Sequence, residues 1–487
     1  MAKFFITNAI PYVNAKPHIG HALEFVQSDV VARYHRQMGD ETLLLCGSDE
    51  NALKIFQAAE KAKQTPKAFT DLHNEEFISL SKKLNVTFDA WQRGTDEEHH
   101  HPSSQKLWKL CEESGDIYKK SYTGLYCVGC ETFYTKDELD KKGECFEHPG
   151  KKLDEVSEEN YFFKLSKYQD FLEDLVKTDT LKITPDIRKN EALAFIRRGL
   201  EDFSVSRSKE RARGWGIPVP GDSTQIMYVW FDALNIYQTG IGFGWDEEKY
   251  KKWAPQDLMV IGKGIIRFHA IYWPAILKSA GLSLPKELFV HGYLTVDGQK
   301  MSKTLGNVVD PIGLIDIYGT DALRYFFLRE IPSTADGDFS ERRLKEVYNA
   351  DLANGLGNLV ARVAKLCETS DFTSMGSKER VSGHIVDVEG YTEAIEGYRF
   401  NEALAIVNEK ITRADKFIDQ EKPWELLKNP TPTQSTKLRE ALSHLVDRIQ
   451  EVAAMLEPFL PETAKKIEEQ FKGPKIKSEN PLFPRIS

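Results

Sequence analysis

The chain has 487 residues, of which 41% are hydrophobic, 11% aromatic and 29% charged; this composition excludes a disordered or fibrous protein and predicts about three domains. The formal net charge is −9, so a nucleic-acid partner would have to be met by a local basic patch. No run of about 18 apolar residues is present, and six cysteines in so long a chain do not make a disulfide scaffold, so we expect no membrane contact and a reducing compartment, the cytoplasm.

The N-terminal residues predict a strand–helix–strand unit. Residues 3–8 and 42–46 are expected to be strands of an open parallel sheet, and residues 18–38 a helix that follows an irregular loop at residues 9–17. The apolar residues that recur at helical spacing are Ile19, Leu23, Val26, Val30 and Tyr34.

The rest of the chain divides into segments that differ in composition and in the spacing of their apolar residues. Residues from about 122 to 219 are dense in charge, glycine and aromatics, and we interpret them as an insertion that splits the sheet domain. A helix bundle is expected from about residue 341, and a coil from about residue 472. Strand-like apolar runs lie at residues 225–231, 257–261 and 287–295, and helical apolar spacing at residues 352–367, 403–418 and 436–455.

Two short motifs suit an anionic ligand. His18-Ile19-Gly20-His21 places two imidazoles on one face of the first helical turn, where a helix N-terminus favours phosphate and the glycine lets a flat ring approach. Lys300-Met301-Ser302-Lys303-Thr304 places two lysines on a loop that can close over an anion. Taken alone, the first motif is as readily a pair of surface histidines, and the second is more often a solvated basic loop.

Four cysteine and histidine residues in the insertion predict a metal site. Cys127 with Cys130, and Cys145 with His148, each have the spacing of a knuckle that presents two ligands to one ion. A complete Cys₃His set leaves no open position, so we expect one structural Zn²⁺ per chain that helps the insertion to fold. The remaining cysteines, Cys46, Cys111 and Cys367, are expected to be core thiols.

Together, the histidine motif early in the chain and the lysine motif late in it resemble those of class I aminoacyl-tRNA synthetases. Further blocks are similar to the methionyl-tRNA synthetase family, and the resemblance extends from about residue 4 to the 460s. These blocks are Ala9-Ile10-Pro11-Tyr12, residues 228–233, Gly262-Lys263, Arg267-Phe268-His269, Trp273-Pro274-Ala275, His291-Gly292-Tyr293 and residues 306–311.

The resemblance implies a methionine–tRNA ligase, which activates L-methionine with ATP to methionyl-adenylate and pyrophosphate and then transfers methionine to the 3′ end of tRNA(Met). It implies that His18, His21, Lys300 and Lys303 are catalytic, with Mg²⁺ accompanying ATP. The implied ATP-binding residues are His18, Gly20, His21, Gly262, Met301 and Lys303. The implied methionine-binding residues are Ala9, Ile10, Tyr12, Asp49, Trp230, Phe268 and His269; without the family, Trp230 and Phe268 are more simply core residues.

Two positions depart from the family pattern. Asn51-Ala52 stands where the family usually has His-Gly, and Gly264 stands where it has an aspartate expected to help hold the ATP ribose. The adenosine contact at Gly264 is therefore open, and backbone or another side chain is expected to substitute.

Contacts with tRNA are expected in two places. Asn358 and Arg362 share a helix face, and Pro423-Trp424 resembles the turn by which the family reads the anticodon, with the indole as a stacking platform. Taken alone, a Pro-Trp pair at a helix start is more often a packing anchor. A basic segment that contains Arg197, Arg198, Arg207, Lys209, Arg211 and Arg213 is as plausibly a phosphate-contacting patch as a solvated face. We interpret His99-His100-His101 as surface helix rather than a metal site.

The combined expectation is an α/β chain with a Rossmann-type catalytic domain at residues 1–120 and 225–290, a zinc-bearing insertion at 121–224, a linker with the lysine motif at 291–345 and a helical anticodon-binding domain at 346–487. The expected partners are ATP, L-methionine and tRNA(Met), and the chain is expected to be a monomer that does not touch membranes. The alternatives are another class I synthetase, a small-molecule nucleotidylyltransferase that also uses the histidine motif, or a catalytically silent tRNA-binding protein.

Overall fold

The structure is a computed structural model that describes residues 2–128, 132–134, 138–147, 150–301, 306–374, 388, 390–428 and 431–486. Three of the predicted site residues, Cys130, His148 and Lys303, lie outside these ranges, as do Ser302 and Thr304 of the lysine motif.

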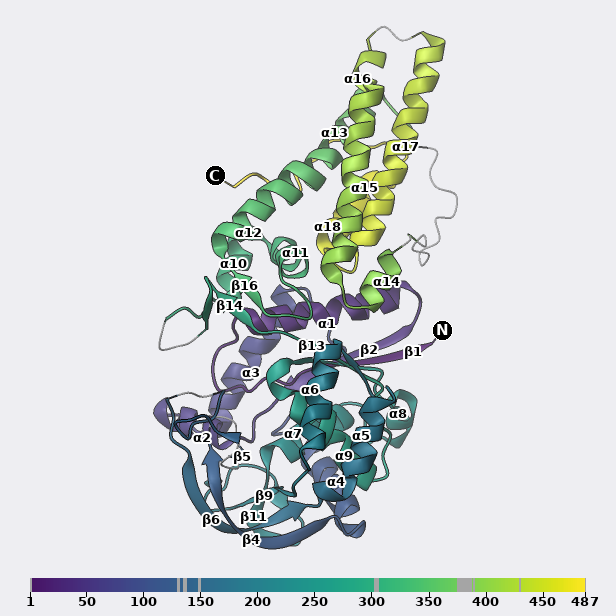
Figure 1. Cartoon of the computed structure of the whole chain (residues 1–487). Helices are drawn as coiled ribbons and strands as arrows, with labels where there is room; N and C mark the ends of the chain where they lie inside the picture. Colours follow the sequence, from purple (N-terminus) through teal and green to yellow (C-terminus); the bar gives the residue numbers. More distant parts are fainter. Residues whose placement is uncertain are drawn as a thin grey trace.

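A six-stranded sheet lies at the centre of the N-terminal half (Figure 1), with the order β3-β2-β1-β12-β13-β7 and parallel pairing throughout. Ile6 lies opposite Leu44 on one side and Leu258 on the other, so β1 joins two parts of the sheet that are far apart in sequence. The predicted open parallel sheet is therefore confirmed. Its strands are β1 Lys3–Asn8, β2 Glu41–Ser48, β3 Ala90–Arg93, β7 Lys182–Thr184, β12 Leu258–Gly262 and β13 Glu287–His291.

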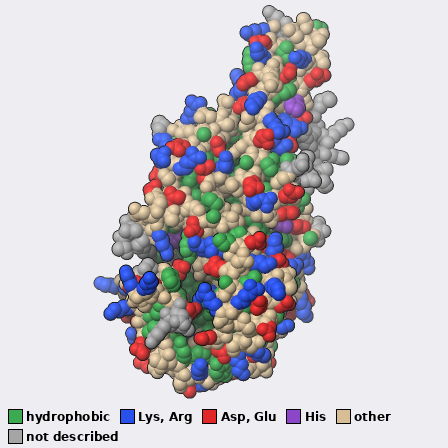
Figure 2. All heavy atoms as spheres, viewed as in Figure 1, with side chains coloured by type: hydrophobic (Ala, Val, Ile, Leu, Met, Phe, Trp, Pro, Cys, Tyr) green, Lys and Arg blue, Asp and Glu red, His purple; other side chains and the backbone are tan. Residues whose placement is uncertain are grey.

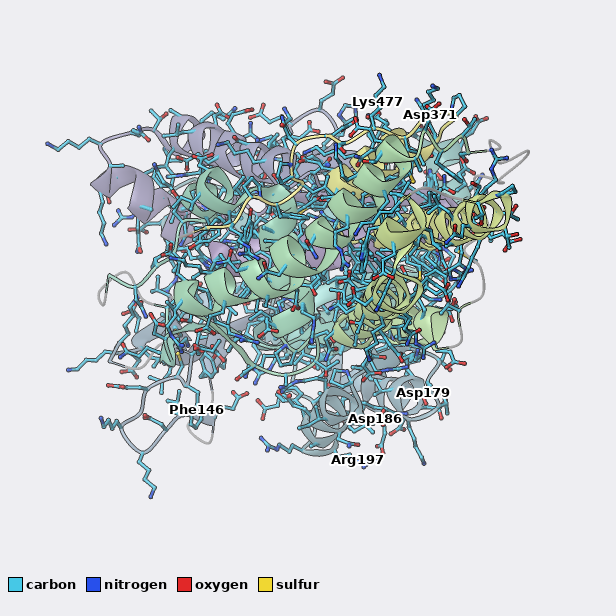
Figure 3. All side chains as sticks on the ribbon, turned by 90° about the horizontal axis from the view of Figure 1, so that it is seen from above. Phe146, Asp179, Asp186, Arg197, Asp371 and Lys477 are labelled. Carbon is cyan, nitrogen blue, oxygen red and sulfur yellow. The ribbon has the colours of Figure 1, made fainter. Side chains whose placement is uncertain are left out.

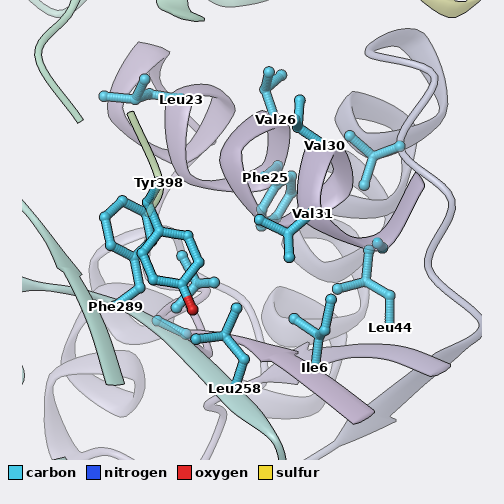
Figure 4. Close-up of a cluster of buried hydrophobic side chains, with 14 of the residues drawn as sticks. Ile6, Leu23, Phe25, Val26, Val30, Val31, Leu44, Leu258, Phe289 and Tyr398 are labelled. Atoms are coloured by element: carbon cyan, nitrogen blue, oxygen red, sulfur yellow. The ribbon is translucent and has the colours of Figure 1, made fainter. Parts of the chain in front are cut away.

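Helix α1, Ile19–Gln37, confirms the helix expected at residues 18–38 and packs its apolar face against the sheet. Figure 4 shows its side chains above strand residues and beside the rings of Phe289 and Tyr398, which stack at 4.5 Å. Burial of each such side chain contributes roughly 1.5–3 kcal/mol, so this cluster fixes the first helical turn relative to the strand ends. The labelled members from α1 are Leu23, Phe25, Val26, Val30 and Val31, and those from the strands are Ile6, Leu44, Leu258 and Phe289.

The insertion is built on a long antiparallel hairpin in which Ile117 pairs with Phe163 at one end and Tyr126 with Asp154 at the other. Three small sheets accompany the central one, with the orders β5-β4-β6-β8, β10-β11-β9 and β15-β14-β16. Their strands are β4 Ile117–Cys127, β5 Thr132–Tyr134, β6 Asp154–Phe163, β8 Phe203–Ser204, β9 Ser206–Ser208, β10 Pro218–Val219, β11 Asp222–Met227, β14 Leu294–Val296, β15 Gln299–Lys300 and β16 Gly337–Phe339.

Two of the expected strands have different bounds. The run at 225–231 is divided, because β11 ends at Met227 and helix α7, Val229–Thr239, begins two residues later. Every residue of α7 is buried, so its sequence carries no amphipathic period that would separate a helix from a buried strand. The run at 287–295 also contains two strands, β13 and β14, which belong to different sheets and are separated at Gly292, where a Cβ would collide with the carbonyl oxygen of Ala335.

Strand β7 was also not anticipated. It lies inside the range 121–224 that the sequence interpretation gave to the insertion, yet it pairs with β13 and forms the edge of the central sheet. The segment between residues 121 and 224 therefore contributes a strand to the sheet that it interrupts. The full set of expected domain boundaries stays a prediction.

The C-terminal part is helical, as expected. Helices α15, Phe400–Glu421, and α17, Pro432–Leu456, pack side by side and extend away from the sheet domain (Figure 1). Helix α13, Asn358–Thr369, continues a π-helical segment, Tyr348–Gly357, and the final coil returns to it, where Asn349 Nδ2 donates to the carbonyl of Ile486 at 2.9 Å.

The other helices cover the sheet or link these parts. They are α2 Leu53–Lys61, α3 Pro66–Lys83, α4 His100–Glu113, α5 Gln169–Lys177, α6 Asp186–Arg197, α8 Glu247–Trp253, α9 Trp273–Ser279, α10 Pro311–Tyr318, α11 Thr320–Glu330, α12 Glu341–Val347, α14 Tyr391–Glu396, α16 Pro423–Leu426 and α18 Pro461–Phe471. Among the described residues, no helix combines the length and apolar character needed to cross a bilayer. Figure 2 shows basic and acidic side chains interspersed over the visible face.

Candidate active site

A cavity of about 550 Å³ opens where β1 and β12 end, and it is walled on the other side by the insertion. Parallel sheets commonly bind ligands at the carboxyl ends of their strands, because the connecting loops converge there. The lining includes Tyr12, Glu24, Tyr134, Glu138, Trp230, Gly262, Lys263, Gly264, Arg267, Phe268 and Tyr293.

The histidine motif caps helix α1. His18 Nδ1 accepts a hydrogen bond from the backbone N–H of Gly20 at 3.1 Å, and His21 Nδ1 accepts one from the backbone N–H of His18 at 3.2 Å. The two rings stack at 3.9 Å. Burial lowers the pKa of His21, and the neighbouring His18 ring lowers it further. Since each Nδ1 accepts, the proton of each neutral ring is on Nε2, and both histidines can donate from that atom.

The chain beside the lysine motif folds back onto this capped turn. The backbone N–H of Ile19 donates to the carbonyl of Val309 at 3.2 Å, and Met301 Cε lies 3.5 Å from the position that a Cβ would take at Gly20. Lys300-Met301, the described start of the lysine motif, therefore lies beside the histidine motif, although the two are far apart in sequence. Lys300 is largely exposed and its Nζ lies 3.8 Å from Glu147 of the insertion.

Aromatic rings form one wall of the cavity. Trp230 and Phe268 stack with centroids 3.8 Å apart and planes within 5°, and Tyr12 meets Trp230 edge-on at 6.0 Å. Behind them, His269 Nδ1 donates to the carbonyl of Ile265 at 2.9 Å and its Nε2 accepts from Tyr237 Oη at 2.9 Å. Burial lowers the pKa of His269 to about 4, so the ring is neutral and presents no charge to the cavity.

The other expected methionine-binding residues are not among those that line the cavity. Asp49 is 3% exposed and is held against the Tyr12 loop by two backbone hydrogen bonds, from its own N–H to Pro11 and from the N–H of Val13. The N–H of Ala9 donates to Val260 of β12 at 2.9 Å, and Ile10 packs partly buried against the core. Tyr12, Trp230, Phe268 and Gly262 line the cavity itself.

Sequence reasoning missed several residues of this wall. Glu24 lies one turn beyond His21 on α1, and its carboxylate accepts from Asn8 Nδ2 at 2.9 Å and pairs with His291 Nε2 at 2.8 Å. The spacing of three residues from His21 could have indicated it, because such residues share a helix face. Glu138 and Tyr134 come from the insertion, and no sequence signal places them at this cavity.

The predicted zinc ligands are described only in part. Cys127 ends β4 and Cys145 lies in the following loop; both are buried, and their sulfur atoms are 3.3 Å apart. Two buried thiols at this separation suit one shared tetrahedral ion. Among the residues that the structure describes, three or more potential ligands do not gather at any point.

The expected tRNA-binding residues lie in the helical part. Arg362 Nη1 pairs with Asp415 and Nη2 with Asp419, each at 2.8 Å, while Asn358 is exposed one turn earlier on α13. Trp424 is 38% exposed and Pro423 beside it is buried. The turn therefore packs Pro423 against the protein and leaves the Trp424 ring partly open to solvent.

Two surface interpretations are wrong. Arg207 is buried rather than part of an exposed basic patch, because its guanidinium donates to Ser204 Oγ at 2.9 Å and lies 4.4 Å from the centroid of Tyr228. His100 is fully buried at the start of α4, with Nδ1 3.0 Å from Thr239 Oγ1. Each side chain also meets a partner from a distant segment, Tyr228 for Arg207 and Thr239 for His100, which the local sequence does not reveal.

Comparison with known proteins agrees with this geometry. The family model described as tRNA synthetases class I (M) matches residues 4–364. A methionine–tRNA ligase from Thermotoga maritima is 41% identical over 475 residues, which are 96% of this chain and 74% of that protein. The chain belongs to the methionyl-tRNA synthetase family. The methionine–tRNA ligase of Brucella suis is 39% identical, over 96% of this chain and 91% of its own length.

Solved structures of the methionyl-tRNA synthetase family share the whole fold. The Mycobacterium tuberculosis enzyme in complex with methionyl-adenylate superposes with a TM-score of 0.92 at 35% identity, and all of both chains are covered. The apo form of that enzyme superposes with a TM-score of 0.84. Class I architecture with an α/β parallel-sheet domain and C-terminal helices is thereby confirmed for this chain.

The two departures from the family pattern each have a partner in the structure. Asn51 Nδ2 donates to Asp232 at 2.7 Å and to the carbonyl of Gly94 at 2.9 Å, and burial raises the pKa of Asp232 well above its ordinary value. At Gly264, any side chain would collide with Tyr293 Oη, which occupies that space and donates to Glu147 at 3.2 Å. The hydroxyl of Tyr293 therefore occupies the space that the side chain of the family's aspartate would need.

Proposed function

We propose that this chain activates L-methionine with ATP to methionyl-adenylate and then transfers methionine to the 3′ end of tRNA(Met). The observation that carries the proposal is the approach of Met301 to Gly20, because it brings Lys300-Met301, the described start of the lysine motif, beside the histidine motif of the helix that also contributes Glu24 to the aromatic-lined cavity. Family membership supports the same reaction.

Methionine would bind against the aromatic wall. The stacked rings of Trp230 and Phe268, with Tyr12 at their edge, suit a thioether, because sulfur–ring contacts contribute about 0.3–1.5 kcal/mol. His269 beneath them is neutral and so presents no charge to the methionine side chain, and Ala9 and Ile10 would lie alongside. Asp49 would accept the ammonium group.

ATP would lie across the end of α1. Protons on Nε2 of His18 and His21 would donate to phosphate oxygens as the methionine carboxylate attacks the α-phosphate and pyrophosphate leaves. Gly20, Gly262 and Met301 would border the nucleotide, while Lys300 and Lys303, with the Mg²⁺ that accompanies ATP, would neutralise the leaving pyrophosphate. Binding two anions in line supplies most of the catalysis in such a reaction.

The helical part would read the tRNA. Trp424 offers an exposed ring for an unstacked anticodon base, and Pro423 fixes the turn that presents it. Asn358 would bond a base edge, and Arg362 would join it if its contacts with Asp415 and Asp419 open or are shared.

Further proposals concern the metal, the assembly and the compartment. Cys127, Cys130, Cys145 and His148 would hold one structural Zn²⁺; the buried sulfur pair supports this, and the ion would take no part in the reaction. We further propose that the chain acts as a monomer. Since the product serves translation, we place the chain in the cytoplasm.

ATP–pyrophosphate exchange tests the function. Exchange should depend on methionine; dependence on valine or cysteine would instead identify another class I synthetase, and exchange without any amino acid a nucleotidylyltransferase. Asp49→Asn should raise the KM for methionine at least tenfold at an unchanged KM for ATP, because a charge-assisted contact contributes roughly 1.5–3 kcal/mol. The matched control is Asp371→Asn, an exposed carboxylate near α13 that should leave both constants unchanged.

A further inference from the structure

A buried hydrogen bond joins the loop after β2 to the first turn of helix α7. Asn51 Nδ2 donates to a carboxylate oxygen of Asp232 at 2.7 Å and also to the carbonyl of Gly94 at 2.9 Å. Asn51 is 8% exposed and Asp232 is 1% exposed, so little water competes for the bond. The two residues are 181 positions apart in sequence, and we call them the Asn51–Asp232 pair.

Each member of the pair lies two residues after a proposed methionine contact. Asp49, the proposed partner of the ammonium group, precedes Asn51 in the loop after β2. Trp230 of the aromatic wall precedes Asp232 in the first turn of α7. The pair therefore connects the segment that would bind the ammonium group to the segment that would bind the thioether.

Other contacts fix the loop that carries Asp49 on its remaining sides. The carboxylate of Glu50 is fully buried and accepts from Arg93 Nε of β3 at 2.8 Å. The carbonyl of Glu50 accepts from the indole N–H of Trp215, in the segment before β10, at 2.7 Å. Loss of the Asn51–Asp232 pair would therefore release the loop from α7 while these contacts keep it folded.

The chemistry of the pair suits an uncharged donor. Burial raises the pKa of Asp232 well above its ordinary value, which reduces the negative charge that this carboxyl carries in the interior. The amide of Asn51 can donate to an oxygen of this carboxyl whether or not it is protonated, so the link does not depend on charge. Asn51 is also one of the two departures from the family pattern.

We propose that the Asn51–Asp232 pair is a positioning unit, which sets the distance between the Asp49 carboxylate and the aromatic wall at Trp230. Neither member of the pair would touch methionine, because each acts through the residue two positions before it. The inference rests on the proposed function, since it assumes that methionine binds between these two contacts. A small displacement of one contact weakens binding and reaction of a substrate that is held at both ends.

The first test compares two asparagine-to-alanine variants. Asn51→Ala should raise the KM for methionine about tenfold in pyrophosphate exchange at an unchanged KM for ATP, because it removes a buried hydrogen bond. Asn235→Ala is the matched control, since this amide is also buried on α7 but donates to Ser103 Oγ of α4 at 2.9 Å. It should leave both constants within about twofold of the parent.

Variants of Asp232 test the same link from the other side. Asp232→Asn keeps an acceptor oxygen for Asn51, so the KM for methionine should stay within about twofold of the parent. Asp232→Ala removes that oxygen and should raise this KM as Asn51→Ala does. Equal rises in Asp232→Asn and Asp232→Ala would show that the hydrogen bond is not what matters and would overturn the inference.

A double-mutant cycle separates positioning from general destabilisation. Because the pair acts through Asp49, Asn51→Ala combined with Asp49→Asn should raise the KM for methionine by far less than the product of the separate effects. The control cycle uses Asp371→Asn, whose carboxylate lies at the outer edge of the molecule (Figure 3) and pairs with Lys475 at 2.9 Å. In that background Asn51→Ala should keep its full effect.

Three further results would also overturn the inference. They are an unchanged KM for methionine in Asn51→Ala and Asp232→Ala, an equal rise in Asn235→Ala, and multiplicative effects with Asp49→Asn. Normal methionine-dependent exchange by the parent alongside any of them leaves the proposed function intact. A parent without methionine-dependent exchange overturns that function itself.

Discussion

Burial sets the charge of individual histidines in this chain. His100 is fully buried between α4 and α7, and burial lowers its pKa from 6.5 to about 3. The folded protein keeps this ring neutral, whereas the unfolded chain takes up a proton below about pH 6.5, so acidification favours unfolding. Burial also keeps His269 neutral, since it lowers the pKa of that ring to about 4.

We expect His100→Asn to weaken this acid sensitivity. Between pH 7.5 and pH 5 the parent should lose about 2 kcal/mol more of its unfolding free energy than the variant, because only the parent has this buried titrating ring. Asparagine is chosen because it can keep a hydrogen bond to Thr239. Urea denaturation at the two pH values measures the difference, and equal losses would contradict the assignment.

Trp424→Ala should separate the two steps of the proposed reaction. Loss of a stacking platform costs about 1–3 kcal/mol per base, so the KM for tRNA should rise roughly 5- to 150-fold while methionine-dependent exchange stays unchanged. Trp245→Ala is the matched control, since Trp245 is similarly exposed, at 41% against 38%, but lies in the sheet domain. If exchange falls with charging, Trp424 is structural.

At the scale of elements, the insertion depends on its knuckle. Its hairpin of β4 and β6 is long, and Cys127 lies at the end of β4, where the sulfur of Cys145 approaches. A structural ion there would fix the hairpin end, because a small domain with little apolar core commonly needs such a crosslink.

Metal analysis should give about one zinc per chain. Cys127→Ser should release that zinc and make the segment between residues 121 and 160 sensitive to limited proteolysis. Cys367→Ser is the control: this thiol is also buried, but in α13, and its loss should leave zinc content unchanged. A folded parent chain without zinc would contradict the assignment.

The elements also show what a sequence can predict. Helix α1 follows from local periodicity, because its large apolar residues recur at helical spacing. Strand β1 follows instead from a short apolar run, and its last four residues are all buried. The fully buried helix α7 and the three-residue strand β7 have no such period, so only tertiary pairing reveals them. At the site, the resemblance to the family identified the residues of the aromatic wall. The placement of Tyr293 in the space next to Gly264 could not be predicted, because it depends on the contact between two segments.

At the scale of the whole molecule, Arg324 ties the sheet domain to the helices. It is fully buried on α11 and pairs with Asp29 of α1 at 2.8 Å, while its other nitrogens donate to the carbonyls of Phe459 and Leu84. Burial raises the pKa of Asp29, but the charges of Arg324 and Arg33 outweigh it and hold the pKa below its ordinary value. The buried polar side-chain atoms of Asp29 and Arg324 therefore all have hydrogen-bond partners.

Arg324→Met should lower the free energy of unfolding by about 3–5 kcal/mol, because it leaves the carboxylate of Asp29 buried with less compensation. Arg343→Met removes a surface pair with Glu330 at 2.7 Å and should cost no more than about 1 kcal/mol. Thermal and urea unfolding measure both. Similar losses in the two variants would show that Arg324 is not the link between the domains.

The sheet order has a consequence for synthesis on the ribosome. Strand β1 is among the first residues to emerge, but its neighbour β12 begins at Leu258, so one edge of β1 stays unpaired until more than half of the chain has been made. Open strand edges recruit other strands. A nascent chain that stalls before Leu258 would therefore expose an unpaired strand edge to other chains. Cells that make this protein need chaperones or rapid elongation to protect that edge.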